Sequence, residues 1–185
     1  MARPTMNPLM RRLRRLIQDP AGEKQIWEDD DLQDALDNHR RETRYARLRE
    51  IETIQPNGSV QFLNYAAGVG YWEDGASLTD ASFNILTTGI TEDLLTGRWT
   101  FLAMPNRPVL VTGWYYDLSG AAAEIVEAWI SKEKCAVDVA IDNQSVKRSQ
   151  RVDHLQAMLK QFRSQMWAES ASLRQGDFNV VAERL

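Results

Sequence analysis

The chain has 185 residues, of which 43% are hydrophobic and 26% are charged, the balance of one globular domain or of a domain with an insertion. Its formal net charge of −4 argues against wrapping nucleic acid by bulk electrostatics. No apolar run approaches the roughly 18 residues that cross a bilayer, and arginines interrupt the stretch where a secretory signal would be apolar, so we expect neither a membrane span nor a signal peptide.

The N-terminal region predicts two short helices. The first should place Pro8 at its first position, where the missing N–H of proline costs nothing. Apolar residues then recur at helical spacing as far as Ile17, and turn residues from 19 to 22 end the helix. The second helix should be capped by one of Asp29 to Asp31, whose carboxylates favour the positive end of the helix dipole, and should end near Arg41.

The pattern changes to that of β structure between about residues 45 and 116. Three runs, 60–65, 99–102 and 109–116, are rich in aromatic and β-branched residues. The Asn57-Gly58 pair lies between two extended segments and predicts a two-residue hairpin. Because further turn residues separate the runs, we expect a small antiparallel β unit of five or six strands.

Two longer helices should follow the β unit. Asp117 or Ser119 caps the first of them, which has a wide apolar face. The second should run from about Ser145 to Ala168, because its apolar residues alternate in spacing between three and four positions, as in a heptad seam. The seam residues are Val152, Leu155, Leu159, Phe162 and Met166.

This element order predicts an α+β fold, in which a bundle of about four helices carries an antiparallel β unit inserted between the second and third helices. Residues 1–43 and 117–175 would form the helical bundle, and residues 44–116 would form the inserted β unit. Residues 176–185 would be an extended C-terminal tail.

The sequence contains no recognisable catalytic or metal centre. His39 and His154 are far apart and lack nearby metal-ligand residues. Asp29 to Asp31 with Asp34 fit helix capping better than a calcium loop, and Cys135 lies in an apolar helical stretch typical of a buried thiol. Phosphate-binding glycine loops and nucleophile motifs are also missing. We therefore predict a protein that is not an enzyme and has no catalytic residue, metal or cofactor.

An enzymatic alternative stays open, because the fold can bring together groups that are distant in sequence. Such an active site would lie in the β unit, near Tyr71, Trp72 and Trp114. Aromatic residues in a β unit belong to the core more often than to a pocket, so we rank this reading below a structural one.

The arginine-rich first helix is the best candidate for contact with nucleic acid. Its four arginines within five positions point around more than half of a helix, which does not form one base-reading face. In an acidic chain we prefer contact of Arg11, Arg12 and Arg15 with an acidic protein partner or with phosphate backbone, and simple solvation explains these residues equally well. A DNA-binding regulator that uses this helix is the alternative function.

The C-terminal tail is a second candidate for docking. Phe178, Val180 and Val181 offer too little surface to fold alone, but they could add a strand to a neighbour or fill a groove. A frayed terminus, or packing on the tail's own domain, is the simpler alternative.

Three stretches also have a shared order and spacing that point to one family. They are Leu13–Gly22 followed by Trp27 and Asp30–Asp37, the strand-to-helix junction Tyr115–Glu124, and Gln144–Gln150 at the entry to the last helix. Together they resemble the head-to-tail adaptor (connector) proteins of tailed double-stranded DNA bacteriophages. The resemblance spans about residues 13 to 167, and the β region departs most from the compact members, whose body is largely helical.

The resemblance implies a structural virion protein that forms a ring, usually a dodecamer, beneath the portal. Such a ring joins the capsid to the tail in the neck of the virion, and it continues the DNA channel used in genome packaging and DNA ejection. The implied partners are the portal protein, a tail or stopper protein, further copies of the chain, and passing duplex DNA that is not read for sequence. No membrane is involved, and assembly would take place in the host cytoplasm. In some relatives a C-terminal segment clasps the portal, and residues 177–185 hold that position here.

Overall fold

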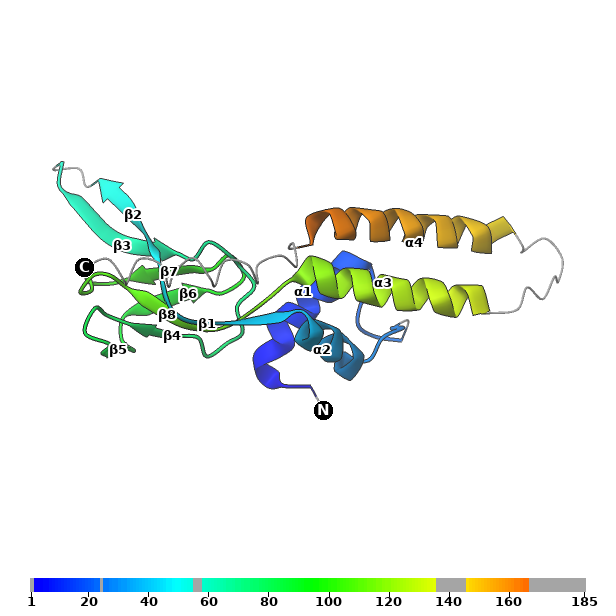
Figure 1. Ribbon diagram of the computed structural model, residues 1–185, viewed down its shortest axis with the longest axis horizontal. Coiled ribbons are helices and arrows are strands. Elements are labelled where there is room, and N and C mark those ends of the chain that lie inside the picture. Colours follow the sequence, from blue (N-terminus) through cyan, green and yellow to red (C-terminus); the bar gives the residue numbers. More distant parts are fainter. Residues whose placement is uncertain (1, 24, 55–57, 136–145, 167–185) are drawn as a thin grey trace, which may run out of the picture.

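A computed structural model describes residues 2–23, 25–54, 58–135 and 146–166. After a 3₁₀ turn at Pro4–Met6, the helices are α1 (Asn7–Ile17), α2 (Asp29–Asn38), α3 (Leu118–Cys135) and α4 (Val146–Gln165). The strands are β1 (Arg40–Arg47), β2 (Arg49–Ile54), β3 (Val60–Ala66), β4 (Ser77–Thr79), β5 (Ile85–Leu86), β6 (Ile90–Asp93), β7 (Arg98–Phe101) and β8 (Leu110–Tyr116). The molecule is elongated, with the helices at one end and the strands at the other (Figure 1).

The mixed α+β class is confirmed, but the β part is larger than predicted. The strands of the described residues form two antiparallel four-stranded sheets, in the orders β1-β8-β4-β5 and β2-β3-β7-β6. All of them follow α2 and precede α3 in the sequence. The prediction of five or six strands missed the short strands β4, β5 and β6, whose two to four residues leave little periodicity to detect.

The two sheets share one apolar core. Tyr65, Trp99 and Phe101 contribute to it from β3 and β7, and Leu78 and Val111 contribute from β4 and β8. The ring centroids of Tyr65 and Phe101 lie 5.3 Å apart in an edge-to-face arrangement, which is a favoured geometry for an aromatic pair. The β part is therefore a small sandwich.

The chain passes from one sheet to the other between β1 and β2. β1 pairs with β8, and after Leu48 the chain continues as β2, which pairs with β3. The Leu48 N–H donates to the Val109 carbonyl oxygen at 2.9 Å, and the Leu48 side chain is buried in the sandwich core. The antiparallel pairing of β2 with β3 confirms a hairpin, but Ile54 pairs with Val60, so the connection is longer than the predicted two residues; residues 55–57 lie outside the described residues.

The second helix ends earlier than predicted. α2 stops at Asn38, and Arg40 and Arg41 are already paired with β8, opposite Tyr116 and Tyr115. Its cap is also different. Glu28 is the N-cap of a capping box, in which the Glu28 N–H donates to the side chain of Asp31 at 3.1 Å, and Asp29 to Asp31 occupy the first turn.

The prediction of a four-helix bundle with an inserted β unit is wrong in its arrangement. α3 lies between α4 on one side and α1 with α2 on the other, and α4 packs chiefly along α3 (Figure 1). The first half of α3 is therefore buried almost all round, as the burial of Leu118, Ala121, Ala122 and Val126 shows. A helix that is apolar on all sides suits a central position better than a corner of a bundle.

The cap of α3 and the seam of α4 agree with the sequence. The Asp117 carboxylate accepts hydrogen bonds from the N–H groups of Ser119 and Gly120, both at 3.0 Å, and so caps α3. Leu155 and Phe162 of the predicted seam are buried in the helical core. No helix among the described residues has the length and apolar character that crossing a membrane requires.

Candidate functional site: an arginine-lined cleft between helix α1 and the β sandwich

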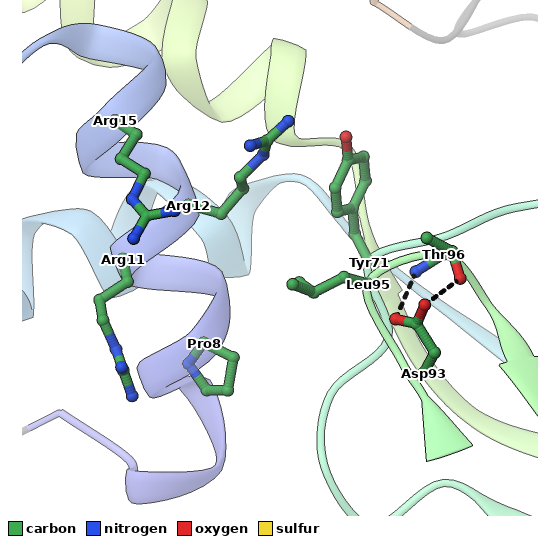
Figure 2. A pocket seen from close by; sticks show the side chains of 8 residues that line it. All are labelled: Pro8, Arg11, Arg12, Arg15, Tyr71, Asp93, Leu95 and Thr96. Atoms are coloured by element: carbon green, nitrogen blue, oxygen red, sulfur yellow. Dashed lines mark hydrogen bonds between the residues drawn. The ribbon is translucent and has the colours of Figure 1, made fainter. Parts of the chain in front are cut away.

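A hollow lies between α1 and the β sandwich. Its volume is about 520 Å³, and its lining residues come from α1 and from two loops of the sandwich (Figure 2). They are Pro8, Arg11, Arg12 and Arg15 on the helix, and Tyr71, Asp93, Leu95 and Thr96 on the sandwich. We call this hollow the arginine cleft.

The helical wall arises from the way in which α1 packs. Its buried face consists of Leu9, Met10, Leu13 and Ile17, each at most 3% exposed. Arg11, Arg12 and Arg15 are separated by one and three positions, so they share the opposite side of the helix and are exposed. The three arginines that the sequence singled out are thus brought together in one wall of a cleft.

The fourth arginine has a different role. Arg14 lies on the buried face, where its guanidinium donates to Asp19 at 3.1 Å, to Asp29 at 2.7 Å and to the Trp27 carbonyl oxygen at 2.8 Å. Asp19 in turn accepts hydrogen bonds from the N–H groups of Ile26 and Trp27. These contacts fix the loop between α1 and α2, and Arg14 is not available to a partner.

The three cleft arginines differ from several other arginines of the described chain in having no carboxylate partner. Within residues 2–23, 25–54, 58–135 and 146–166, none of the three makes an ion pair. Arg3, Arg44 and Arg107, by comparison, each bond a carboxylate. The cleft therefore gathers three arginines that are not ion-paired with any described residue, and the one carboxylate in its lining, Asp93, is hydrogen-bonded to Thr96.

The opposite wall is a tight turn between β6 and β7. Both carboxylate oxygens of Asp93 accept hydrogen bonds from Thr96, one from its N–H at 3.3 Å and one from its hydroxyl at 2.6 Å. Leu95 is 38% exposed, and its side chain points toward α1, while Arg12 extends toward Tyr71 (Figure 2). This wall thus combines an apolar side chain, an aromatic ring and a carboxylate that is already hydrogen-bonded.

Backbone contacts hold the two loops of this wall together. The N–H of Tyr71 donates to the Leu95 carbonyl oxygen at 3.1 Å, and the N–H of Ala67 donates to the Gly97 carbonyl oxygen at 2.8 Å. Gly97 has a φ of 65°, and an added Cβ would lie 2.2 Å from the Val69 carbonyl oxygen. Glycine is therefore required here both for its conformation and for the close approach of the loops.

A polar cluster next to the cleft joins the helical end to the sandwich. Arg3 makes a two-pronged ion pair with Asp37 and also bonds Glu73 and the Tyr116 hydroxyl, both at 3.3 Å. The Tyr116 hydroxyl donates to Glu73 at 2.5 Å, and the hydroxyl of Thr5 donates to Glu73 at 2.7 Å. Burial, and then the bond to Glu73, raise the pKa of Tyr116, while the bond to Asp37 raises the pKa of Arg3.

A second, apolar surface lies on the β sandwich. A hollow of about 360 Å³ is bordered by β3 and by the segment after β7. We call it the apolar hollow, and its lining residues are Ser59, Val60, Gln61, Leu63, Leu102, Ala103 and Met104. Leu102 is 84% exposed and Met104 is 58% exposed, so this surface has large apolar side chains in contact with solvent.

Phe178, Val180 and Val181 lie outside the described residues. Of the aromatics proposed for an enzymatic pocket, Tyr71 lines the arginine cleft, but Trp72 is buried in the sandwich core. Trp114 lines a separate hollow of about 330 Å³, where the Arg40 guanidinium carbon lies 4.6 Å from its ring centroid. The structure therefore separates the three aromatics.

The histidines have ordinary surroundings. His39 Nε2 lies 3.1 Å from a carboxylate oxygen of Glu124, and His154 lies on an exposed part of α4. Among the residues that the structure describes, no group of three or more histidine, cysteine or acidic side chains could hold a metal ion.

Sequence reasoning did not identify the sandwich wall of the arginine cleft. Asp93, Leu95 and Thr96 belong to a segment in which the sequence indicated only turn residues between the strand runs. Nothing in the local pattern shows that this turn faces α1.

No protein-family model matches this chain, and neither a curated protein nor a solved structure matches it. The resemblance to the phage adaptor proteins therefore remains an expectation drawn from the sequence.

Proposed function

We propose that the protein is a structural virion component that forms a ring, with twelve copies as the expected number, beneath the portal of a tailed bacteriophage. The observation that carries the proposal is the presence of two hollows of different chemistry on one subunit. The arginine cleft is charged, the apolar hollow is not, and the two share no lining residue. A connector needs such a pair, because each subunit must bind both its neighbours and a different component.

The two surfaces lie at opposite ends of strand β7. The cleft includes Leu95 and Thr96, just before the strand, and the hollow includes Leu102 to Met104, just after it. With about 3.3 Å per residue along a strand, the two sites are separated by on the order of 15 Å or more. Two partners can therefore contact one subunit together.

A ring also fits the charge of the chain. Heterologous contacts between unlike surfaces close into a ring when the rotation between neighbours permits. The net charge of −4 suits the wall of a channel, because a cationic lumen would hold passing DNA through its phosphates. The proposed partners are thus the portal, a tail or stopper protein and further copies of the chain, with duplex DNA passing through unread. The proposed location is the neck of the virion, after assembly in the host cytoplasm.

The experiment that tests this proposal is a mass measurement by light scattering, on the full chain alone and after mixing with the cognate portal protein. We expect a ring, or a portal complex of matching stoichiometry. A monomer that does not bind the portal would contradict the proposal. Replacing Phe178 and Val181 by aspartate should abolish portal binding while the circular dichroism spectrum is unchanged, and retained binding would exclude the C-terminal tail as the docking segment.

A DNA-binding regulator is the second candidate, favoured by the three exposed arginines of the cleft. If each arginine neutralises one phosphate, the logarithm of the affinity for duplex DNA should fall against the logarithm of the salt concentration with a slope of about −2.7. Fluorescence anisotropy with a labelled duplex measures this slope. Absence of binding at low salt would dispose of this candidate.

A further inference from the structure

We infer that the arginine cleft is a docking site for an acidic segment of another polypeptide, one that carries apolar side chains beside its carboxylates. This inference goes beyond ring formation, and it rests on the proposed function only for the source of the segment, which would be a portal or tail component. The inference itself rests on the residues that line the arginine cleft.

The helical wall supplies the part of the site that recognises charge. Arg11, Arg12 and Arg15 lie on one side of α1, and none of them makes an ion pair with another described residue. Each guanidinium offers a planar fork of donors that matches a carboxylate or a phosphate. The ligand must therefore be an anion with more than one charged group, spread along about one helical turn.

The sandwich wall decides which kind of anion fits. Leu95 is 38% exposed and points toward α1, and the Tyr71 ring stands beside it (Figure 2). A peptide can place a leucine or phenylalanine against these two side chains. A sugar-phosphate backbone has no large apolar side chain to place there, and its phosphates would also approach the carboxylate of Asp93. An acidic peptide can avoid that carboxylate by placing an apolar residue opposite it.

The size and rigidity of the cleft are those of a site formed in advance. Its volume of about 520 Å³ lies in the range of roughly 300–1,000 Å³ that is usual for ligand pockets. Hydrogen bonds from Tyr71 to Leu95 and within the Asp93–Thr96 turn fix the sandwich wall. The sandwich wall therefore needs little ordering on binding, and the entropy cost falls on the three exposed arginine side chains and on the peptide.

The test measures binding of a short fluorescein-labelled peptide of glutamate and leucine to the full chain, by fluorescence anisotropy. We expect saturable binding, and the same peptide with glutamine in place of glutamate should not bind. The triple variant Arg11→Gln, Arg12→Gln, Arg15→Gln should lose affinity by about a hundredfold, since charge-assisted hydrogen bonds are the strong ones. The single variant Leu95→Ser should weaken binding by about fivefold, because it removes the apolar contact.

The matched control is the triple variant Arg44→Gln, Arg47→Gln, Arg49→Gln. These arginines are exposed on β1 and β2, and their removal changes the net charge by the same amount. Binding should be close to that of the unmodified chain. An equal loss in both triple variants would overturn the inference, because the attraction would then come from the overall charge.

Two further outcomes would also overturn it. One is the absence of saturable binding by a chain that still forms rings, which separates failure of this inference from failure of the proposed function. The other is a labelled DNA duplex of similar length that binds more tightly than the peptide and is released by the Arg11, Arg12 and Arg15 substitutions. That result would assign the cleft to nucleic acid.

Discussion

Arg14 and Asp19 form an ion pair in the interior of the helical end, with 3.1 Å between Nη1 and Oδ2 and side chains that are 5% and 1% exposed. The pair closes the loop that follows α1, because the Asp19 carboxylate also accepts the N–H groups of Ile26 and Trp27. It thereby orients α1 and, with it, the arginines that face the cleft.

Replacing Arg14 by methionine should therefore destabilise the fold. The substitution leaves the Asp19 carboxylate buried without its cation, and breaking such a pair from one side costs about 3 kcal/mol. Urea denaturation followed by circular dichroism measures this loss. The control is Arg15→Met on the exposed side of the same helix, which should change the free energy of unfolding by less than about 0.5 kcal/mol. Similar losses in both variants would contradict the assigned role of Arg14.

Gly97 should be intolerant of substitution. In Gly97→Ala the new Cβ meets the Val69 carbonyl oxygen at 2.2 Å, and the backbone has a positive φ of 65°. We expect a loss of at least about 2 kcal/mol in the free energy of unfolding. Gly68→Ala is a matched control nearby, because an added Cβ at Gly68 has no atom within 4 Å. The expectation fails if the two alanine variants unfold at the same urea concentration.

The stability of the protein should fall at alkaline pH through Tyr116. Burial and the bond to Glu73 raise the pKa of the folded phenol above its ordinary value of about 10. Below that pH both states keep the proton, and the contribution to stability is complete. As the pH rises above about 10, the unfolded chain loses the proton and the folded chain does not, so the free energy of unfolding decreases.

Tyr116→Phe provides the corresponding measurement. The variant should be less stable at neutral pH because the hydrogen bonds to Glu73 and Arg3 are lost, but its stability should depend less steeply on pH above about 10. Some dependence will remain, since burial also raises the pKa of Tyr65. Identical slopes in the variant and the unmodified chain would show that Tyr116 ionises normally in the folded state.

At acidic pH, the stability of the protein should depend on Asp80, which closes the turn between β4 and β5. Its carboxylate accepts hydrogen bonds from the side chain and the N–H of Asn84 and from the N–H of Ser82, and these bonds lower its pKa. The folded pKa lies below the unfolded value of about 3.9, so the contribution is present above that pH and is lost as the pH falls toward the folded pKa. Urea midpoints between about pH 2 and pH 6 should change less for Asp80→Asn than for the unmodified chain.

Local patterns were sufficient to predict α1 with Pro8 in its first turn, the Asp117 cap of α3 and the seam of α4. They were not sufficient for the end of α2. Arg40 and Arg41 continue a helical composition, but they become a strand because they pair with Tyr116 and Tyr115, which are distant in sequence. Such non-local pairing overrides the weak preference of a few residues. The packing of α4 along α3, on the side away from α1 and α2, also depends on non-local contacts. It follows from the burial of α3 on almost all sides, which the sequence pattern of α4 does not indicate.

Half of the candidate site could be predicted from the sequence. Arg11, Arg12 and Arg15 were recognised because a helix with an apolar stripe must expose its remaining positions, and Arg14 could be separated from them only by its buried partners. The wall that contains Leu95 and Asp93 is set by how the sandwich sits against α1. No periodicity or spacing in the sequence records that arrangement.

The apolar hollow should be a contact between subunits of the ring. Leu102 is 84% exposed, and burying it against a neighbouring protein would contribute about 2 kcal/mol at each contact. Leu102→Asp removes this contribution and places a charge in the interface, so rings should be lost in light scattering while the urea midpoint is unchanged. Ile85→Asp is the control, because Ile85 is 68% exposed but belongs to the other sheet and does not line the hollow. Rings that persist in Leu102→Asp, or that are lost equally in Ile85→Asp, would show that the hollow is not the contact between subunits.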